Sequence, residues 1–244
     1  MALHHNPRII TSGLVLALDA GDVNSYPGSG TTWYDLSGNG NHVTLYNGPT
    51  FADGTLTGNG TNEYGRTNNT LNLTGLSAIT VISTWKQTST TAGGMVYEHT
   101  STWNTNNDYE GVSYGGFGLY TNSNGTGTVA NMNHHQLRGN VGYGGSNTTS
   151  PNTATFQHYT TIHNFAAAGA SETLVYINGA FADDSYGTTD NTSTFGDDYL
   201  YLWSRGGSSA WSTNSLGFLQ IYNRILSAKE ILQNYNATRT RFGL

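Results

Sequence analysis

The sequence of 244 residues lacks cysteine and is poor in charge. Without cysteine, the chain has no disulfide bonds, thiolate nucleophiles or cysteine-based zinc sites, so packing must stabilise the fold. Lys, Arg, Asp and Glu supply 10% of the residues, against roughly 25% in an average soluble protein. The formal net charge is −6 and the basic residues are scattered. Both features argue against a nucleic-acid partner, because phosphate neutralisation needs clustered Lys and Arg.

Long apolar runs are also missing. The longest runs have the length of a strand, so we expect no membrane insertion. Residues 1–12 are polar rather than apolar, so we expect no secretory signal. Solubility must come from the abundant Asn, Thr, Ser and Gly. Their neutral hydrogen-bonding groups suit sugars or tight subunit contacts better than strongly charged partners.

Short segments rich in β-branched and aromatic residues, separated by Gly and Asn, predict around ten or more strands. No linker divides the chain, and all-β sandwiches of this length are commonly single domains. We therefore predict one all-β, two-sheet antiparallel sandwich. The main strand segments are 14–18, 64–73, 80–85, 95–98, 112–120, 137–143 and 199–203.

Two local patterns sharpen this prediction. The Asn178-Gly179 pair predicts a hairpin between 173–177 and 180–182, because it supplies the positive φ angles of a type I′ turn. Tyr199, Tyr201 and Trp203 alternate with leucines. We expect these three aromatic residues on one face of their strand.

One short helix is predicted near 227–236, directly after the last strand. Ser227 and Glu230 have the spacing of a capping box. Leu226 and Ile231 stand where a hydrophobic staple closes. Ile231, Leu232 and Tyr235 give the helix one apolar face, so we expect it to cover a β-structure.

Three segments resemble the laminin-G-like, concanavalin-A-like jelly-roll domains, in the version found in structural proteins of tailed bacteriophages. They are GLVLALDAG at 13–21, SYPGSGTTWYDLSGNGNHVTL at 25–45 and LQIYNRILSAKEILQNYNATRTRFGL at 219–244, with a further match at 156–179. The resemblance implies an N-terminal arm over 1–12 and a single jelly-roll domain over 13–244.

Asp35, Ser37 and Asn39 place oxygen side chains at alternate positions, as in the first half of an EF-hand loop. The twelfth position is Tyr46 rather than Glu, so we favour a turn in which these side chains bond their own backbone. The resemblance nevertheless implies one calcium ion, held by Asp19, Asp22 or Asp35 together with backbone carbonyls. A second acidic concentration favours simple solvation over a metal site; it comprises Asp183, Asp184, Asp190, Asp197 and Asp198.

Catalytic patterns are weak, so we expect no enzyme. Glycoside hydrolysis needs two suitably spaced carboxylates. Glu98 stands alone, and we interpret Asp108 and Glu110 as a surface pair. We also expect His134 and His135 at the surface, and His158 as a hydrogen-bonded structural histidine of a core strand.

Two tryptophans, Trp103 and Trp211, lie among Ser, Thr, Asn and Gly in predicted loops. Such aromatic residues stack on a pyranose ring while amides bond its hydroxyls, but they also anchor protein interfaces. Both readings stay open. With Asn107, Tyr109 and Tyr114, they are the predicted ligand-binding residues.

The resemblance implies a non-enzymatic phage virion protein, made in the host cytoplasm. It would decorate the capsid or form a fibre-like appendage, and attach through weak glycan binding. Expected partners are virion proteins, a host cell-surface glycan and further copies in a homo-oligomer such as a trimer. The alternatives are a glycoside hydrolase or lyase of the same fold, and a purely structural capsid cement protein.

Overall fold

The computed structural model describes residues 7–89, 93–99, 115–123, 128–139, 143–149, 155–184 and 191–244. Sheet A contains β1 (Leu14–Asp19), β4 (Thr50–Ala52), β5 (Thr55–Thr57), β8 (Ala78–Lys86), β13 (Gln157–Asn164), β14 (Thr173–Ile177), β15 (Ala180–Asp184) and β18 (Ser215–Tyr222). Sheet B contains β2 (Thr32–Trp33), β3 (Val43–Tyr46), β6 (Tyr64–Thr67), β9 (Gly94–His99), β10 (Gly116–Ser123), β11 (Thr128–Arg138), β12 (Tyr143–Thr149) and β17 (Leu200–Leu202). A separate two-stranded ribbon joins β7 (Leu71–Asn72) to β16 (Asp197–Asp198).

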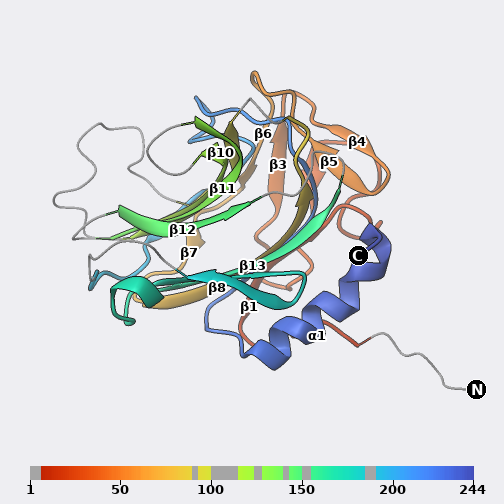
Figure 1. Cartoon of the computed structure of the whole chain (residues 1–244). Coiled ribbons are helices and arrows are strands. Elements are labelled where there is room, and N and C mark those ends of the chain that lie inside the picture. The colour runs from red at the N-terminus through yellow and green to blue at the C-terminus, as the bar shows by residue number, and fades with distance from the viewer. Residues whose placement is uncertain are drawn as a thin grey trace, which may run out of the picture.

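The two large sheets lie face to face, with the one α-helix of the described residues outside them (Figure 1). Sheet A has the order β15-β14-β13-β8-β18-β5-β4, with β1 also paired to β18. Sheet B has the order β12-β11-β10-β9-β17-β6-β3-β2. All the strand pairs described in both sheets are antiparallel, including β8 with β18 and β9 with β10. The predicted two-sheet antiparallel sandwich is therefore confirmed.

Large aromatic side chains fill the space between the sheets. Trp33 of sheet B stacks on Trp203, with 6.3 Å between ring centroids, and Trp85 of sheet A stacks on Tyr159 at 5.3 Å. Trp203 was expected beside Tyr201 on one strand face, and this prediction is wrong. Trp203 follows β17 with φ of 58°, which turns its ring into the core, where Nε1 donates to the Asn214 carbonyl oxygen at 2.8 Å.

Part of the interior is polar, and it holds histidines that the sequence placed at the surface. His134 and His135 are both fully buried. His135 Nδ1 lies 2.8 Å from Thr161 Oγ1, and its Nε2 lies 3.0 Å from Thr148 Oγ1. Each of these hydroxyls can donate or accept, so the imidazole is paired without charge. His158 lies in a core strand as expected, but neither of its ring nitrogens has a hydrogen-bond partner.

Helix α1 (Ala228–Thr238) lies against the outer face of sheet A (Figure 1). The predicted capping box is confirmed: Glu230 N donates to Ser227 Oγ at 3.4 Å, and Ser227 N donates to Glu230 Oε2 at 2.8 Å. Leu226 and Ile231 share one buried cluster with residues of β8, β13 and β18. Two 3-10 turns, η1 (Gly169–Ser171) and η2 (Arg239–Phe242), complete the described helical structure.

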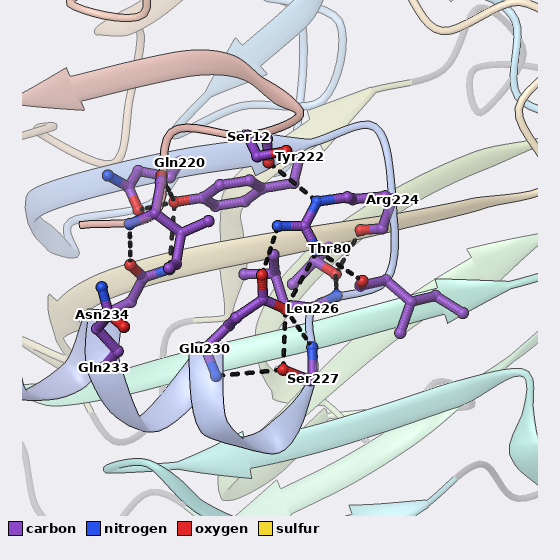
Figure 2. A network of polar contacts seen from close by, with 12 residues as sticks. Ser12, Thr80, Gln220, Tyr222, Arg224, Leu226, Ser227, Glu230, Gln233 and Asn234 are labelled. Atoms are coloured by element: carbon purple, nitrogen blue, oxygen red, sulfur yellow. Dashed lines mark hydrogen bonds and ion pairs between the residues drawn. The ribbon is translucent and has the colours of Figure 1, made fainter.

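The helix also holds the described part of the N-terminal arm, as Figure 2 shows in part. Ile10 N donates to Asn234 Oδ1 at 2.7 Å, and Gln233 Nε2 donates to the Arg8 carbonyl oxygen at 2.8 Å. Tyr222 Oη lies 2.8 Å from the Ile10 carbonyl oxygen. Residues 8–10 are therefore fixed to α1 and β18.

The strand predictions hold best where a turn residue marks the end of a strand. The Asn178-Gly179 hairpin is confirmed, with φ of 52° and 79° between β14 and β15. The predicted strand 64–73 is instead two strands, β6 and β7, in different sheets. The predicted strand 137–143 is wrong, because β11 ends at Arg138 and β12 begins at Tyr143. Strand β11 has 11 residues, and most of it was not predicted because its sequence is largely polar.

Candidate functional site

The outer face of sheet B, which points away from sheet A, carries a continuous row of residues across seven strands. Leu200 and Leu202 of β17 point into the core, so Tyr201 between them points outward. Strand register places Tyr201 beside Arg66 on one side and Glu98 on the other. The complete row is Thr44, Arg66, Tyr201, Glu98, Gly118, Gln136 and Gly145.

A group of half-buried aromatic residues surrounds one end of this row. Tyr46 and Tyr64 stack with ring centroids 4.5 Å apart, and Tyr64 lies 6.3 Å from Tyr201. Tyr199 follows at 6.4 Å from Tyr201. We call these four residues the tyrosine patch. All four are neither fully buried nor fully exposed, so each ring keeps a part that a ligand can reach.

Arg66 lies within the tyrosine patch and is held there by it. Its guanidinium carbon stands 4.6 Å from the ring centroid of Tyr199 and 5.6 Å from that of Tyr46. Its Nη2 also donates to Tyr46 Oη at 3.2 Å. Cation–π contacts and a hydrogen bond therefore restrict this side chain before any ligand arrives.

Glu98 is the buried carboxyl group of the same row. Its side chain is 2% exposed, and its Oε2 lies 3.5 Å from Arg205 Nε. Burial raises the pKa of Glu98 to about 8, although Arg205 and Arg138 act to lower it. Burial prevails because a carboxylate loses its hydration there. At neutral pH this group therefore holds its proton in a large share of molecules.

Glycines separate Glu98 from the polar side chains of β11. Gly118 of β10 stands between Glu98 and Gln136, and Gly116 stands beside Arg138. Neither glycine carries a side chain across this part of the face. Gly116, Gly118, Glu98 and Gln136 are all buried, however, so this part of the face is not open to solvent.

Four of the five predicted ligand-binding residues, Trp103, Asn107, Tyr109 and Tyr114, lie outside the described residues, as do Asp108 and Glu110. The fifth, Trp211, lies in a loop as expected, with its ring 5.9 Å from that of Tyr64. The structure therefore joins Trp211 to the tyrosine patch. No local sequence pattern predicts a site at Tyr46, Tyr64 and Arg66, since they belong to two separate strands of ordinary composition.

The predicted metal residues serve as hydrogen-bond acceptors. Asp35 accepts from Ala17 N and Ser37 N through Oδ1, and from Ser37 Oγ and Asn41 N through Oδ2, at 2.7–2.9 Å. The preferred interpretation of 35–41 as a self-bonded turn agrees with these contacts. Asp19 accepts from Gly21 N and pairs with Arg241. Within the described ranges, no group of three or more acidic or histidine residues is placed to hold a metal ion.

A pocket of about 310 Å³ lies between β1, β18, the arm and the end of α1. Asp19, Asp22 and Ser37 line it together with Phe218 and Gln220. It is on the opposite side of the sandwich from the tyrosine patch. No helix among the described residues is long and apolar enough to span a membrane.

Comparison with solved structures agrees with the fold. The structure is similar to the botulinum neurotoxin serotype D binding domain, with 13% identity, a TM-score of 0.66 and coverage of 94% of this chain and 53% of that chain. It is also similar to the receptor binding domain of the botulinum neurotoxin C/D mosaic serotype, with 13% identity, a TM-score of 0.66, and 94% and 52% coverage. Trypanosoma rangeli sialidase matches with 17% identity, a TM-score of 0.60, and 94% and 33% coverage.

These similarities establish a β-sandwich fold and no more, because identity is low. The chain spans about half the length of the neurotoxin domains and a third of the sialidase. No protein-family model and no curated protein matches the sequence.

Proposed function

We propose that this chain is a carbohydrate-binding β-sandwich module that binds a glycan at the tyrosine patch on the outer face of sheet B. The stacked and half-buried tyrosine patch carries the proposal. Tyrosine rings offer apolar faces to a sugar ring, and their hydroxyls offer polar tips to its hydroxyl groups. Solved structures of similar fold include receptor binding domains of botulinum neurotoxin and a sialidase.

A glycan array probed with the purified protein tests this function. For any glycan retained, Tyr64→Ala and Tyr201→Ala should each lower affinity about tenfold, as expected for loss of about 1–2 kcal/mol at an aromatic contact. Phe181→Ala is the matched control, because Phe181 is an exposed aromatic residue of sheet A. An array without any retained glycan would refute the proposal, and so would equal losses from all three variants.

The biological setting that we propose is a bacteriophage virion, on which repeated copies convert weak sugar contacts into avidity. This part is supported by the resemblance of segments 25–45 and 219–244 to jelly-roll domains of phage structural proteins. Capsid decoration without any glycan, as a cement protein, is the competing role. Imaging of virions by electron cryo-microscopy should show density for the protein in symmetric oligomers, and absence of such density would contradict the assignment.

We also propose that a calcium ion binds at Asp19, Asp22 or Asp35. Adding calcium after chelation should raise the melting temperature if the ion belongs to the domain. An unchanged melting temperature would remove calcium from this account.

Glu98 favours a second function, cleavage of a polysaccharide. A carboxylic acid that keeps its proton near neutral pH is suited to general acid catalysis. Glu98 has this property and lies in the same row as Tyr201. Hydrolysis by the two-carboxylate mechanism also needs a second acidic group. Release of new sugar ends from any array-positive polysaccharide, abolished in Glu98→Gln, would establish an enzyme; unchanged chain length would leave a binding module.

A further inference from the structure

The pocket of about 310 Å³ beside helix α1 has a floor made by two neighbouring strands of sheet A. In β18, Phe218 and Gln220 alternate with aliphatic residues of the core between the sheets, so both point to the outer face. Strand register pairs Phe218 with Asp19 of β1, and Gln220 with Ala17. All four residues line the pocket. The floor therefore combines an aromatic ring, a methyl group, an amide and a carboxylate.

The walls of this pocket come from three segments that are distant in sequence. They are the N-terminal arm at Ile9 and Thr11, the end of α1 at Ala237, and the loops after β1 and β2 at Asp22 and Leu36. The opening reaches solvent, because Thr11 is exposed and Leu36 is 41% exposed. Hydrogen bonds already hold the arm against α1. The pocket is therefore formed before any ligand enters, which lowers the entropy lost on binding.

Gln220 is fully buried on the pocket floor, and one end of its amide group is unused. Its Oε1 accepts from Tyr222 Oη at 2.9 Å. Its Nε2 has no hydrogen-bond partner among the described residues. Most buried amide groups in folded proteins are hydrogen-bonded, and one that lacks a partner destabilises the fold. An oxygen atom of a ligand on the floor would supply the missing acceptor.

Two carboxylate groups border the same pocket and have acceptor capacity to spare. Asp19 accepts from Gly21 N and pairs with Arg241, in both cases through Oδ1. Asp22 accepts from Asn24 N and Nδ2 at 2.9 Å, again through Oδ1. Among the described residues, no donor is bound to the Oδ2 atom of either aspartate. The pocket therefore offers an amide donor on its floor and free carboxylate oxygens beside it.

Together these groups favour a neutral ligand with several hydroxyl groups. A hydroxyl group donates to a carboxylate and accepts from an amide, so one sugar ring can satisfy both. An ammonium group has no acceptor for Gln220 Nε2. A ligand carboxylate would meet the like charges of Asp19 and Asp22. Phe218 and Leu36 add apolar surface for the C–H face of a sugar ring.

We propose that this pocket is a second carbohydrate site, in which Gln220 and Asp22 bond the hydroxyl groups of a neutral sugar. It lies on the opposite side of the sandwich from the tyrosine patch and does not depend on it. Its volume of about 310 Å³ is at the small end of ligand pockets, which measure about 300–1,000 Å³. The pocket therefore suits the terminal sugar of a glycan rather than a length of chain. Two sites on one molecule would let it hold two glycans at once and gain avidity.

NMR titration of the full chain with methyl glycosides of glucose, galactose, mannose and N-acetylglucosamine tests this site. A chelator in the buffer ensures that a sugar held through a calcium ion is not counted. At least one glycoside should bind with a Kd of about 1 mM or lower. Gln220→Leu and Asp22→Asn should each lower that affinity about tenfold, as expected for loss of a hydrogen bond to the sugar.

Two further variants show where the sugar binds. Asp197→Asn is the matched control for Asp22→Asn, because Asp197 is an exposed aspartate of β16 outside the pocket. Its affinity should equal that of the wild type. Tyr201→Ala should also leave glycoside binding unchanged, because it alters the tyrosine patch alone. Unfolding midpoints must show that each variant is folded. If Gln220→Leu does not fold, Asp22→Asn decides the test.

Three results would overturn the inference. The first is that no glycoside binds, and the second is that the pocket variants bind as tightly as Asp197→Asn. The third is that n-hexylamine, an ammonium probe, binds more tightly than every glycoside. Binding that is lost in Tyr201→Ala and kept in Gln220→Leu belongs to the tyrosine patch, so it would refute the pocket and support the proposed function. A negative glycan array combined with glycoside binding in the pocket would have the reverse meaning.

Discussion

The two outer faces of the sandwich differ in what covers them. On sheet A, the apolar side chains of Ile82, Ile162 and Phe218 are covered by Ile231 of helix α1 and by Leu226, which precedes the helix. On sheet B, the corresponding face carries tyrosines, arginines and one glutamic acid. A β-sandwich needs a hydrophobic core between its sheets but no particular chemistry outside them. The chain uses one outer face for stability and leaves the other polar and aromatic.

The same contrast appears in the two glutamate–arginine pairs. Glu230 lies on the helix side, where Arg224 bonds both of its carboxylate oxygens at 2.6 and 3.1 Å (Figure 2). The hydrogen bonds from Arg224 lower the pKa of Glu230 to about 2. Glu98 faces Arg205 at 3.5 Å, but burial raises its pKa to about 8. A glutamate beside an arginine is therefore kept ionised at Glu230, where the hydrogen bonds dominate, and kept protonated at Glu98, where burial dominates.

A fall in pH should have the largest effect on stability, because histidines are buried on both faces and between the sheets. Burial lowers the pKa of His134 and His158 to about 4 and of His163 to about 3. In the unfolded chain these groups titrate near pH 6.5, so only the unfolded chain gains protons as pH falls below that value. Each histidine should cost about 2 kcal/mol of stability at pH 5.

Glu98 acts in the opposite direction, since its folded pKa is above its unfolded one, but three histidines outweigh it. Urea unfolding at pH 7.5 and pH 5 should show a net loss of about 3 kcal/mol. His158→Gln should reduce the pH dependence of stability, because Gln does not titrate. The variant loses no hydrogen bond, because His158 has none. Stability that stays constant down to pH 5 would contradict the burial of these histidines.

Truncation of the contact between helix α1 and sheet A should have the next largest effect on stability. Ile231→Ala removes a fully buried side chain from the cluster between α1 and sheet A, and should cost about 3 kcal/mol in urea unfolding. Leu232→Ala is the neighbouring control, because Leu232 is 47% exposed, and should change little. Glycan affinity should be unaffected by both if the two faces act separately. Equal destabilisation by both variants would argue against the helix as a cover.

Removal of the buried carboxyl group of Glu98 should have a smaller effect, and it should raise stability rather than lower it. The raised pKa of Glu98 contributes stability below pH 4.5, and this is lost as pH rises through 8. The Gln side chain of Glu98→Gln does not titrate, so at pH 6 this variant should be more stable than the wild type by about 2 kcal/mol. Glu230→Gln is the matched variant, and it should be less stable than the wild type at the same pH. If both variants are less stable than the wild type, Glu98 is ionised and stabilised by Arg205 rather than kept protonated by burial.

The helix cap should give the smallest effect. Ser227→Ala removes the hydroxyl that accepts from Glu230 N and should cost about 1 kcal/mol. Lys229→Ala, on the exposed side of the same turn, should leave the unfolding midpoint within about 0.5 kcal/mol of the wild type. A cap variant as stable as this control would mean that packing alone positions α1.

Local sequence patterns were sufficient to predict the sandwich, the hairpin at Asn178-Gly179 and the capped helix. These features depend on local rules: positive φ angles at a turn, the reach of a side chain to a neighbouring amide, and the period of apolar residues. The same rules failed for β11, because its polar side chains pair with hydroxyls on other strands. His135 finds Thr148 and Thr161, which no local pattern connects to it.

The location of the candidate site, in contrast, depends on how the strands pair in the folded protein. Arg66, Tyr201 and Glu98 come from distant segments, and strand register alone makes them neighbours. The direction of each side chain depends on which face of a strand is buried. The pKa of Glu98 depends on how deeply the whole fold encloses it. Pairing between remote strands and removal of water are non-local, so they arise only when the sheets have formed.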